Sequence, residues 1–123
     1  MYLVKRSWTT AKKTDGYASK FESGYAQELE LRKKAKDIKK YDTQVTIPLN
    51  VNGYHICNYI IDFIVYHNDK TIEYVETKGY SFPVWRIKFK LFEALYSEKK
   101  GVKISVVYQG KQIYKPLKKI KDK

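Results

Sequence analysis

The chain has 123 residues, of which 25 are lysine or arginine and 13 are aspartate or glutamate, giving a formal charge of +12 at pH 7. This length is typical of one domain, no apolar run could cross a bilayer, and the amino terminus lacks the apolar stretch of a secretory signal. We therefore expect a single domain over residues 1–123, in the cytoplasm and without a membrane partner. The positive field favours a polyanionic partner, and nucleic acid is the leading polyanion inside a cell.

The amino-terminal part is expected to contain a basic arm and then a helix. Residues 1–18 carry cations among small polar residues with no regular period, which indicates an irregular arm. A helix should begin at Ser19, because Ser19 and Glu22 have the spacing of a capping box and apolar residues follow at helical intervals. It should end near Asp37, after a run of cations that suits the negative end of the helix dipole.

Three strands are expected next. Residues 44–49 alternate as a strand, Pro48 indicates a sheet edge, and the residues that follow have turn chemistry typical of a hairpin. The second strand, residues 56–66, is nearly continuous in apolar residues, which predicts a central strand covered on both faces. A third strand should run over residues 71–78 and stop at Gly79.

A second helix should begin at Pro83 and carry apolar and aromatic residues to Tyr96, so many that we expect it to be widely buried. Residues 102–108 read as a buried strand, and residues 110–123 as a lysine-rich tail. The helix is long enough for a crossover, so the third and fourth strands should be parallel, in a mixed sheet with helices on both sides. The sequence predicts an α/β fold in the order helix, three strands, helix, strand. The cations expected to contact phosphate are Lys5, Arg6, Lys12, Lys13, Lys20, Lys118 and Lys119.

Two carboxylates carry the expected chemistry. Asp62 lies in the middle of the most apolar strand, where an unpaired charge would be costly and therefore needs a partner. Glu76 and Lys78 are two apart on the next strand and should share a face. Asp62 and Glu76 can become cross-strand neighbours, and two close carboxylates repel unless a cation lies between them. Such hard oxygen ligands favour Mg²⁺ or Mn²⁺. The alternative is a structural ion pair of Lys78 with either acid.

The stretch Val75-Glu76-Thr77-Lys78-Gly79, together with Asp62 and the predicted element order, resembles the PD-(D/E)xK nuclease superfamily. The resemblance covers about residues 17–108 and extends to small phage-encoded nucleases, including the endonuclease I type of Holliday-junction resolvase, through Phe21-Glu22-Ser23-Gly24. It implies a restriction-endonuclease-like core, with Asp62 and Glu76 holding one or two divalent ions and Lys78 beside the attacking water. The usual proline before the aspartate is replaced by Ile61.

In that family a glutamate of the first helix often completes the metal site. Glu22 is favoured here, because it shares a helix face with the apolar residues and should face the sheet. Glu28, one position off that stripe and expected to be the more exposed of the two, is the alternative. Gln44 on the first strand could approach the site, but we interpret it as a plain strand residue. His55 and His67 could act as acid or base, but each lies at a predicted strand margin, and we interpret both as surface or turn residues.

The leading hypothesis is a Mg²⁺- or Mn²⁺-dependent endonuclease that hydrolyses DNA phosphodiester bonds by activating a water molecule, with branched or Holliday-junction DNA as one possible substrate. Junction cleavage needs two symmetric cuts, so that substrate would imply a homodimer. The competing hypothesis is a non-catalytic nucleic-acid-binding module in which the acids and Lys78 form structural ion pairs. Phosphate contacts carry no base identity, so the sequence leaves DNA and RNA open.

Overall fold

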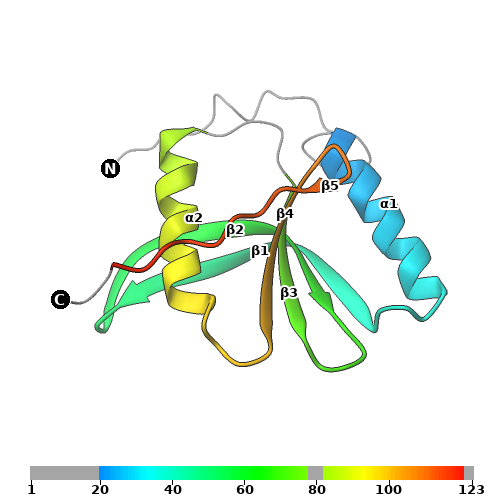
Figure 1. Cartoon of the computed structure of the whole chain (residues 1–123), viewed down its shortest axis with the longest axis horizontal. Helices are drawn as coiled ribbons and strands as arrows, with labels where there is room; N and C mark the ends of the chain where they lie inside the picture. Colours follow the sequence, from blue (N-terminus) through cyan, green and yellow to red (C-terminus); the bar gives the residue numbers. More distant parts are fainter. Residues whose placement is uncertain (1–19, 78–81, 121–123) are drawn as a thin grey trace.

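The described residues of this computed structural model, 20–77 and 82–120, form one mixed sheet with two helices (Figure 1). The sheet has five strands in the order β1-β2-β3-β4-β5, and every neighbouring pair is antiparallel except β3 and β4. The α/β class, the mixed sheet and the parallel pair across the second helix are therefore confirmed. In chain order the elements are α1 (Lys20–Lys34), β1 (Lys40–Val51), β2 (Tyr54–Tyr66), β3 (Ile72–Thr77), α2 (Pro83–Tyr96), β4 (Val102–Tyr108) and β5 (Lys111–Gln112).

The first two strands make a long hairpin. β1 starts at Lys40, earlier than the sequence pattern predicts, and Pro48 lies on it at the edge of the sheet, as expected. The hairpin turn places Asn52 and Gly53 at φ values of 52° and 85°. Two successive positive φ values match the right-handed twist of paired strands, and asparagine followed by glycine tolerates them best.

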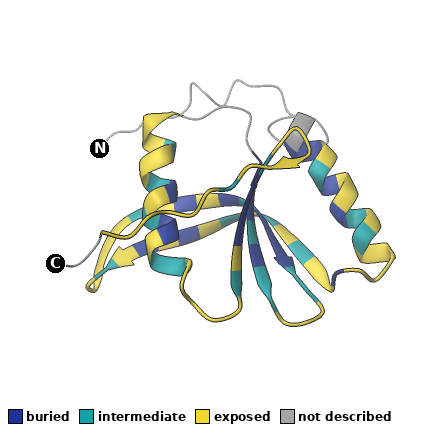
Figure 2. Cartoon of the chain, in the orientation of Figure 1, coloured by how far each residue is buried: buried dark blue, intermediate teal, exposed yellow. Residues whose placement is uncertain are grey.

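The two helices cover opposite faces of the sheet. Val75 of β3 packs in the cluster below α1, with Leu29 and Phe63, whereas its neighbour Tyr74 packs against the cluster below α2, which contains Phe92. Because successive strand residues point to opposite faces, α1 and α2 must lie on different sides. Figure 1 shows the two helices flanking the sheet, and Figure 2 shows the buried residues gathered along the strands between them.

Burial is narrower than the sequence predicts in two elements. β2 is covered on both faces only near its end, and Ile56 and Ile60 are 55% and 53% exposed, because the hairpin extends past the residues that pair with β3. α2 buries one face through Phe89 and Phe92 but leaves Ile87 69% exposed. The prediction of a widely buried second helix is wrong, since its apolar residues surround the helix while only one side meets the sheet.

The carboxy-terminal segment is more ordered than a simple basic tail. β5 pairs with β4 through a turn in which Gln109 and Gly110 have φ values of 51° and 80°. Beyond β5, the Tyr114 hydroxyl donates a 2.6 Å hydrogen bond to Glu93, and its ring packs edge-on against Phe89 of α2. No helix within the described ranges is long and apolar enough to cross a membrane.

Candidate functional site

The alternation of β2 breaks at Asp62. Ile61 and Phe63 are two residues apart and should share a face, but Ile61 packs below α2 and Phe63 below α1. The paired register of β1 and β2 skips Asp62 and the facing Gln44, whose φ is 52°. The last paired residues of β2 and β3 at this end are Phe63 and Val75. Asp62 and Glu76 are the next residues on each strand, so they stand opposite each other where the strands part. Polar side chains can therefore enter the sheet at this point.

Asp62 is held by neutral donors. Its Oδ2 atom accepts 2.8 Å hydrogen bonds from both the backbone N–H and the hydroxyl of Thr77, and Gln44 Nε2 lies 3.4 Å from Oδ1. Burial raises the pKa of the Asp62 carboxyl above its usual value, although the hydrogen bonds from Thr77 oppose this. A partner for Asp62 was expected from the sequence, and Thr77 is the residue that donates two hydrogen bonds to it.

Glu76 is more deeply buried, with 8% of its surface exposed. The Tyr59 hydroxyl donates a 2.5 Å hydrogen bond to Oε1, and the Trp85 indole N–H donates a 3.0 Å bond to Oε2. Burial raises the pKa of Glu76 well above its usual value, and the negative charges of Asp62 and Glu22 raise it further. Glu76 is therefore a carboxyl group in a low-dielectric environment whose charged neighbours among the described residues are themselves acids.

The helix carboxylate that joins them is Glu22. It is 3% exposed in the first turn of α1, and the side-chain amide of Gln44 donates a hydrogen bond to its Oε2. The same amide nitrogen faces Asp62, so Gln44 links two acids that are 40 residues apart in sequence, Glu22 and Asp62. We call Glu22, Asp62, Glu76 and Gln44 the carboxylate cluster.

Glu28 points elsewhere. It is exposed and lines a cavity of about 420 Å³ between α1 and β4, with Tyr25 and Thr77 among the other lining residues. The expectation that Glu22 faces the sheet and Glu28 is the more exposed of the two is confirmed.

The cluster fits a divalent cation in donor type but is not a preformed metal site. Carboxylate oxygens suit Mg²⁺ and Mn²⁺, and mutual repulsion of the acids gives a cation a favourable place. Among the described residues, however, no three His, Cys, Asp or Glu side chains are arranged to hold a metal ion. Lys78, the expected neighbour of the attacking water, lies outside the described residues.

Four residues that contact the acids of this site were not predicted from the sequence to do so: Tyr59, Trp85, Thr77 and Gln44. Tyr59 and Trp85 look like core aromatics in an apolar strand and helix, and strand alternation assigns Thr77 to the face opposite Glu76. Gln44, interpreted as a plain strand residue, in fact bridges two acids. The positive φ of Gln44, at a position where β1 and β2 are not paired, has no sequence signal of its own.

The two histidines lie outside the carboxylate cluster, as expected. His55 pairs with Asn50 on the hairpin at 2.8 Å. His67 is 2.7 Å from Glu73, which also accepts a 2.5 Å hydrogen bond from the Ser105 hydroxyl. Each histidine therefore has a side-chain partner outside the carboxylate cluster.

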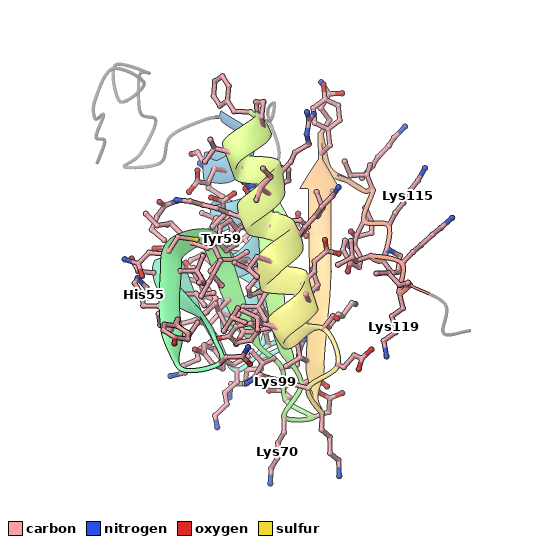
Figure 3. The ribbon with its side chains drawn as sticks, turned by 90° about the vertical axis from the view of Figure 1, so that its left-hand side faces the viewer. His55, Tyr59, Lys70, Lys99, Lys115 and Lys119 are labelled. Atoms are coloured by element: carbon pink, nitrogen blue, oxygen red, sulfur yellow. The ribbon has the colours of Figure 1, made fainter. Side chains whose placement is uncertain are left out.

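The cations expected to contact phosphate are only partly described. Lys118 and Lys119 are exposed, and Lys119 forms a 2.6 Å ion pair with Glu98 on the surface. Figure 3 shows Lys115 and Lys119 pointing outward from the carboxy-terminal segment. The remaining candidates fall outside the described part of the chain or, for Lys20, have an undescribed side chain: Lys5, Arg6, Lys12, Lys13 and Lys20.

A family model described as "Protein of unknown function (DUF1064)" matches residues 6–112, and the chain belongs to this family. No curated protein and no solved structure matches the chain significantly.

Proposed function

We propose that this member of the DUF1064 family is a metal-dependent endonuclease that hydrolyses DNA phosphodiester bonds. The observation that carries the proposal is the convergence of Glu22, Asp62 and Glu76, from α1, β2 and β3, at the point where the β2 alternation breaks. Three elements contribute one acid each, and the described part of the chain supplies neutral donors rather than cations to hold Asp62 and Glu76.

The positive net charge supports a nucleic-acid substrate, and a group of buried acids in such a protein needs an explanation. A chain with formal charge +12 attracts a polyanion without help. Buried carboxylates facing phosphate would weaken that attraction, so a protein that only binds gains nothing from them. Carboxylates become useful when they hold a divalent ion against the phosphate.

In the proposed site, Asp62 and Glu76 would hold the ion, Glu22 would complete the ligand set, and Lys78 would stand beside the nucleophilic water. A bound Mg²⁺ or Mn²⁺ supplies an acidified water and stabilises charge on the phosphate. Thr77 fixes the Asp62 carboxylate through two hydrogen bonds, while Tyr59 and Trp85 fix both oxygens of Glu76. Such supporting contacts orient ligands before the ion arrives.

The fold supports the same proposal at a coarser level. The order helix, three strands, helix, strand agrees with a restriction-endonuclease-like core, with β5 added at the sheet edge. We include that core arrangement, and branched DNA such as a four-way junction as the preferred substrate, in the proposal.

The second candidate is a non-catalytic nucleic-acid-binding module. It is favoured by the absence, among residues 20–77 and 82–120, of a preformed three-ligand metal group, and by the exposed lysines of the carboxy-terminal segment. On that reading, binding would not depend on a divalent ion.

The deciding experiment incubates the full chain with end-labelled linear, nicked, flapped and four-way-junction DNA in Mg²⁺, in Mn²⁺ and in EDTA. We expect cleavage only with a divalent ion, fastest on branched DNA. Binding of all four substrates with no cleavage of any of them in either metal would leave the binding module as the function.

A further inference from the structure

A second cavity adjoins the carboxylate cluster. It has a volume of about 450 Å³ and lies between the first half of β2 and the start of α2. Its apolar lining comes from Tyr59, Ile60, Phe82, Val84 and Trp85. This volume falls in the range of about 300–1,000 Å³ that is typical of small-molecule sites. We call it the edge pocket.

The edge pocket exists because β2 is longer than its neighbour. β3 pairs with β2 only from Phe63 onward, so the edge of β2 before that residue is not covered by β3. α2 closes part of this space, with Tyr59 lying between β2 and the helix (Figure 3). Three apolar side chains at the pocket remain open to solvent: Ile60 is 53%, Phe82 42% and Val84 58% exposed.

The pocket and the carboxylate cluster share a wall. Tyr59 and Trp85 both line the pocket, and both donate hydrogen bonds to the Glu76 carboxylate. Trp85 is also stacked on Phe89, with ring centroids 5.1 Å apart and planes inclined by 11°, which fixes its orientation. A ligand in the pocket would therefore lie one side chain away from a proposed metal ligand.

The chemistry of the lining suits a nucleobase. Aromatic and branched apolar side chains offer surfaces for a flat ring, while Thr46, Asn58 and Lys88 add hydrogen-bonding groups and one cation. An apolar protein segment would match the first group, but the formal charge of +12, Lys88 in the wall and the adjoining carboxylate cluster favour a nucleotide.

We propose that the edge pocket receives one unpaired nucleobase of the substrate, next to the phosphodiester bond that is cut. A base within a duplex cannot enter, because its faces are stacked on its neighbours and its edge is paired. The substrate class is then DNA with unpaired nucleotides beside the cut, such as a flap, a loop or a distorted branch point. This inference rests on the proposed function, since it takes Glu76 as part of the cleavage site.

The test uses the full chain carrying Trp8→Phe, so that Trp85 is its only tryptophan. In EDTA, where cleavage cannot occur, a 12-nucleotide oligothymidylate is titrated into the protein and compared with a blunt 12-base-pair duplex. We expect the single strand to quench Trp85 fluorescence and the duplex to leave it nearly unchanged, although both bind through their phosphates.

Charge-neutral variants then locate the contact. Phe82→Ala should weaken single-strand binding about 5- to 150-fold, the usual range for removing an aromatic stacking partner. Ile60→Ala should weaken it less, and Ile87→Ala, an exposed apolar residue of α2 outside the pocket, should change nothing. All three residues are exposed, and thermal melting checks that the variants remain folded.

Equal quenching by single strand and duplex, or unchanged affinity in both Phe82→Ala and Ile60→Ala, would overturn the inference. Because the titration is done without metal, its result is separate from the cleavage assay. Base binding without cleavage would refute the proposed function and leave the edge pocket as a base-binding site only. Cleavage without base binding would refute this inference alone.

Discussion

Two buried glutamates of β3 are treated differently by the fold. Glu73 is 6% exposed and Glu76 is 8% exposed, and three positions along a strand separate them, so they point to opposite faces. Glu73 contacts His67, which can carry a positive charge, and the Ser105 hydroxyl. Glu76 receives two neutral donors and has two further acids beside it.

Burial of an acid therefore does not by itself mark a functional site. Glu73 has what a structural buried acid needs, a partner that can offset its charge. The described residues that shift the pKa of Glu76 are two acids and two neutral donors, and none of them carries a positive charge. Burial and the two acids favour the neutral form of Glu76. Like charges placed together at a cost in stability are typical of sites that use them.

Substitutions in the carboxylate cluster itself should have the greatest effect on cleavage. Glu76→Gln and Asp62→Asn should each reduce Mg²⁺-dependent cleavage about a thousandfold or more, since a bound ion supplies several kcal/mol of transition-state stabilisation. Binding to DNA in EDTA should be unchanged or tighter, because the substituted side chain can no longer carry a negative charge near phosphate. Single-turnover cleavage and fluorescence anisotropy measure the two effects.

The controls for these variants come from the other buried glutamates. Glu73→Gln removes the acid on the opposite face of the same strand, and Glu93→Gln removes one that also accepts a tyrosine hydroxyl, at 2.6 Å from Tyr114. Both should cleave at nearly the unmodified rate. Near-normal cleavage by Glu76→Gln would sink the site assignment.

The next effect separates the two helix glutamates. Glu22→Gln should lower cleavage about 10- to 100-fold, a loss typical of a supporting metal-site residue, because the other two acids remain. Glu28→Gln should leave the rate nearly unchanged, since Glu28 lies on the cavity beside Thr77 and outside the carboxylate cluster. The reverse pattern in cleavage rates would move the helix ligand to Glu28 and leave Glu22 with a structural role.

A smaller effect concerns stability and pH. The folded-state pKa values of Asp62 and Glu76 are raised, so between the unfolded and folded values the unfolded chain binds fewer protons. The free energy of unfolding should therefore fall as pH rises from about 4 through the raised folded values, by about 1.4 kcal/mol for each unit of pKa difference. Urea unfolding between pH 4 and pH 8 measures this slope.

Glu76→Gln tests the origin of that slope. The variant carries no charge at position 76, so its unfolding free energy should decline less with rising pH. Glu28→Gln, at an exposed position, should follow the unmodified protein. An identical decline in Glu76→Gln would show that the slope arises from other groups.

The smallest effect is in the basic segment. Lys118→Gln and Lys119→Gln should each reduce the slope of log K against log salt for DNA binding by about one, if each lysine neutralises one phosphate. Lys70→Gln, in the turn before β3, is the matched control with no expected change. Point substitutions are preferable to removing the residues after Gly110, because β5 and Tyr114 would be lost as well. Unchanged slopes in both tail variants would exclude these lysines from the interface.

Much of the fold follows from local patterns. The β4 bounds, residues 102–108, agree with the predicted strand, because a short apolar run between a glycine and a polar stretch has few other interpretations. The parallel pairing of β3 and β4 follows from the helix between them. β5 has two residues, too few for any period to reveal it.

The candidate site is only partly readable in the same way. Asp62 stands out as an acid in an apolar strand, and Glu76 through its spacing of two residues from Lys78. Glu22 stands out because it shares a helix face with apolar residues. Tyr59 and Trp85 do not stand out, since they look like core residues until the packing places their polar atoms against Glu76. The break at Asp62 depends on two helices packing on different faces, which no local pattern encodes.

The most direct test of the central claim, that the carboxylate cluster holds a divalent ion, is a calorimetric titration of Mn²⁺ into the full chain at neutral pH. Unmodified protein and Glu73→Gln should bind Mn²⁺ with the same affinity, and Glu76→Gln should bind it at least about tenfold more weakly because a charged oxygen ligand is lost. Equal Mn²⁺ affinity in Glu76→Gln and the unmodified protein, or no Mn²⁺ binding by either, would contradict the account.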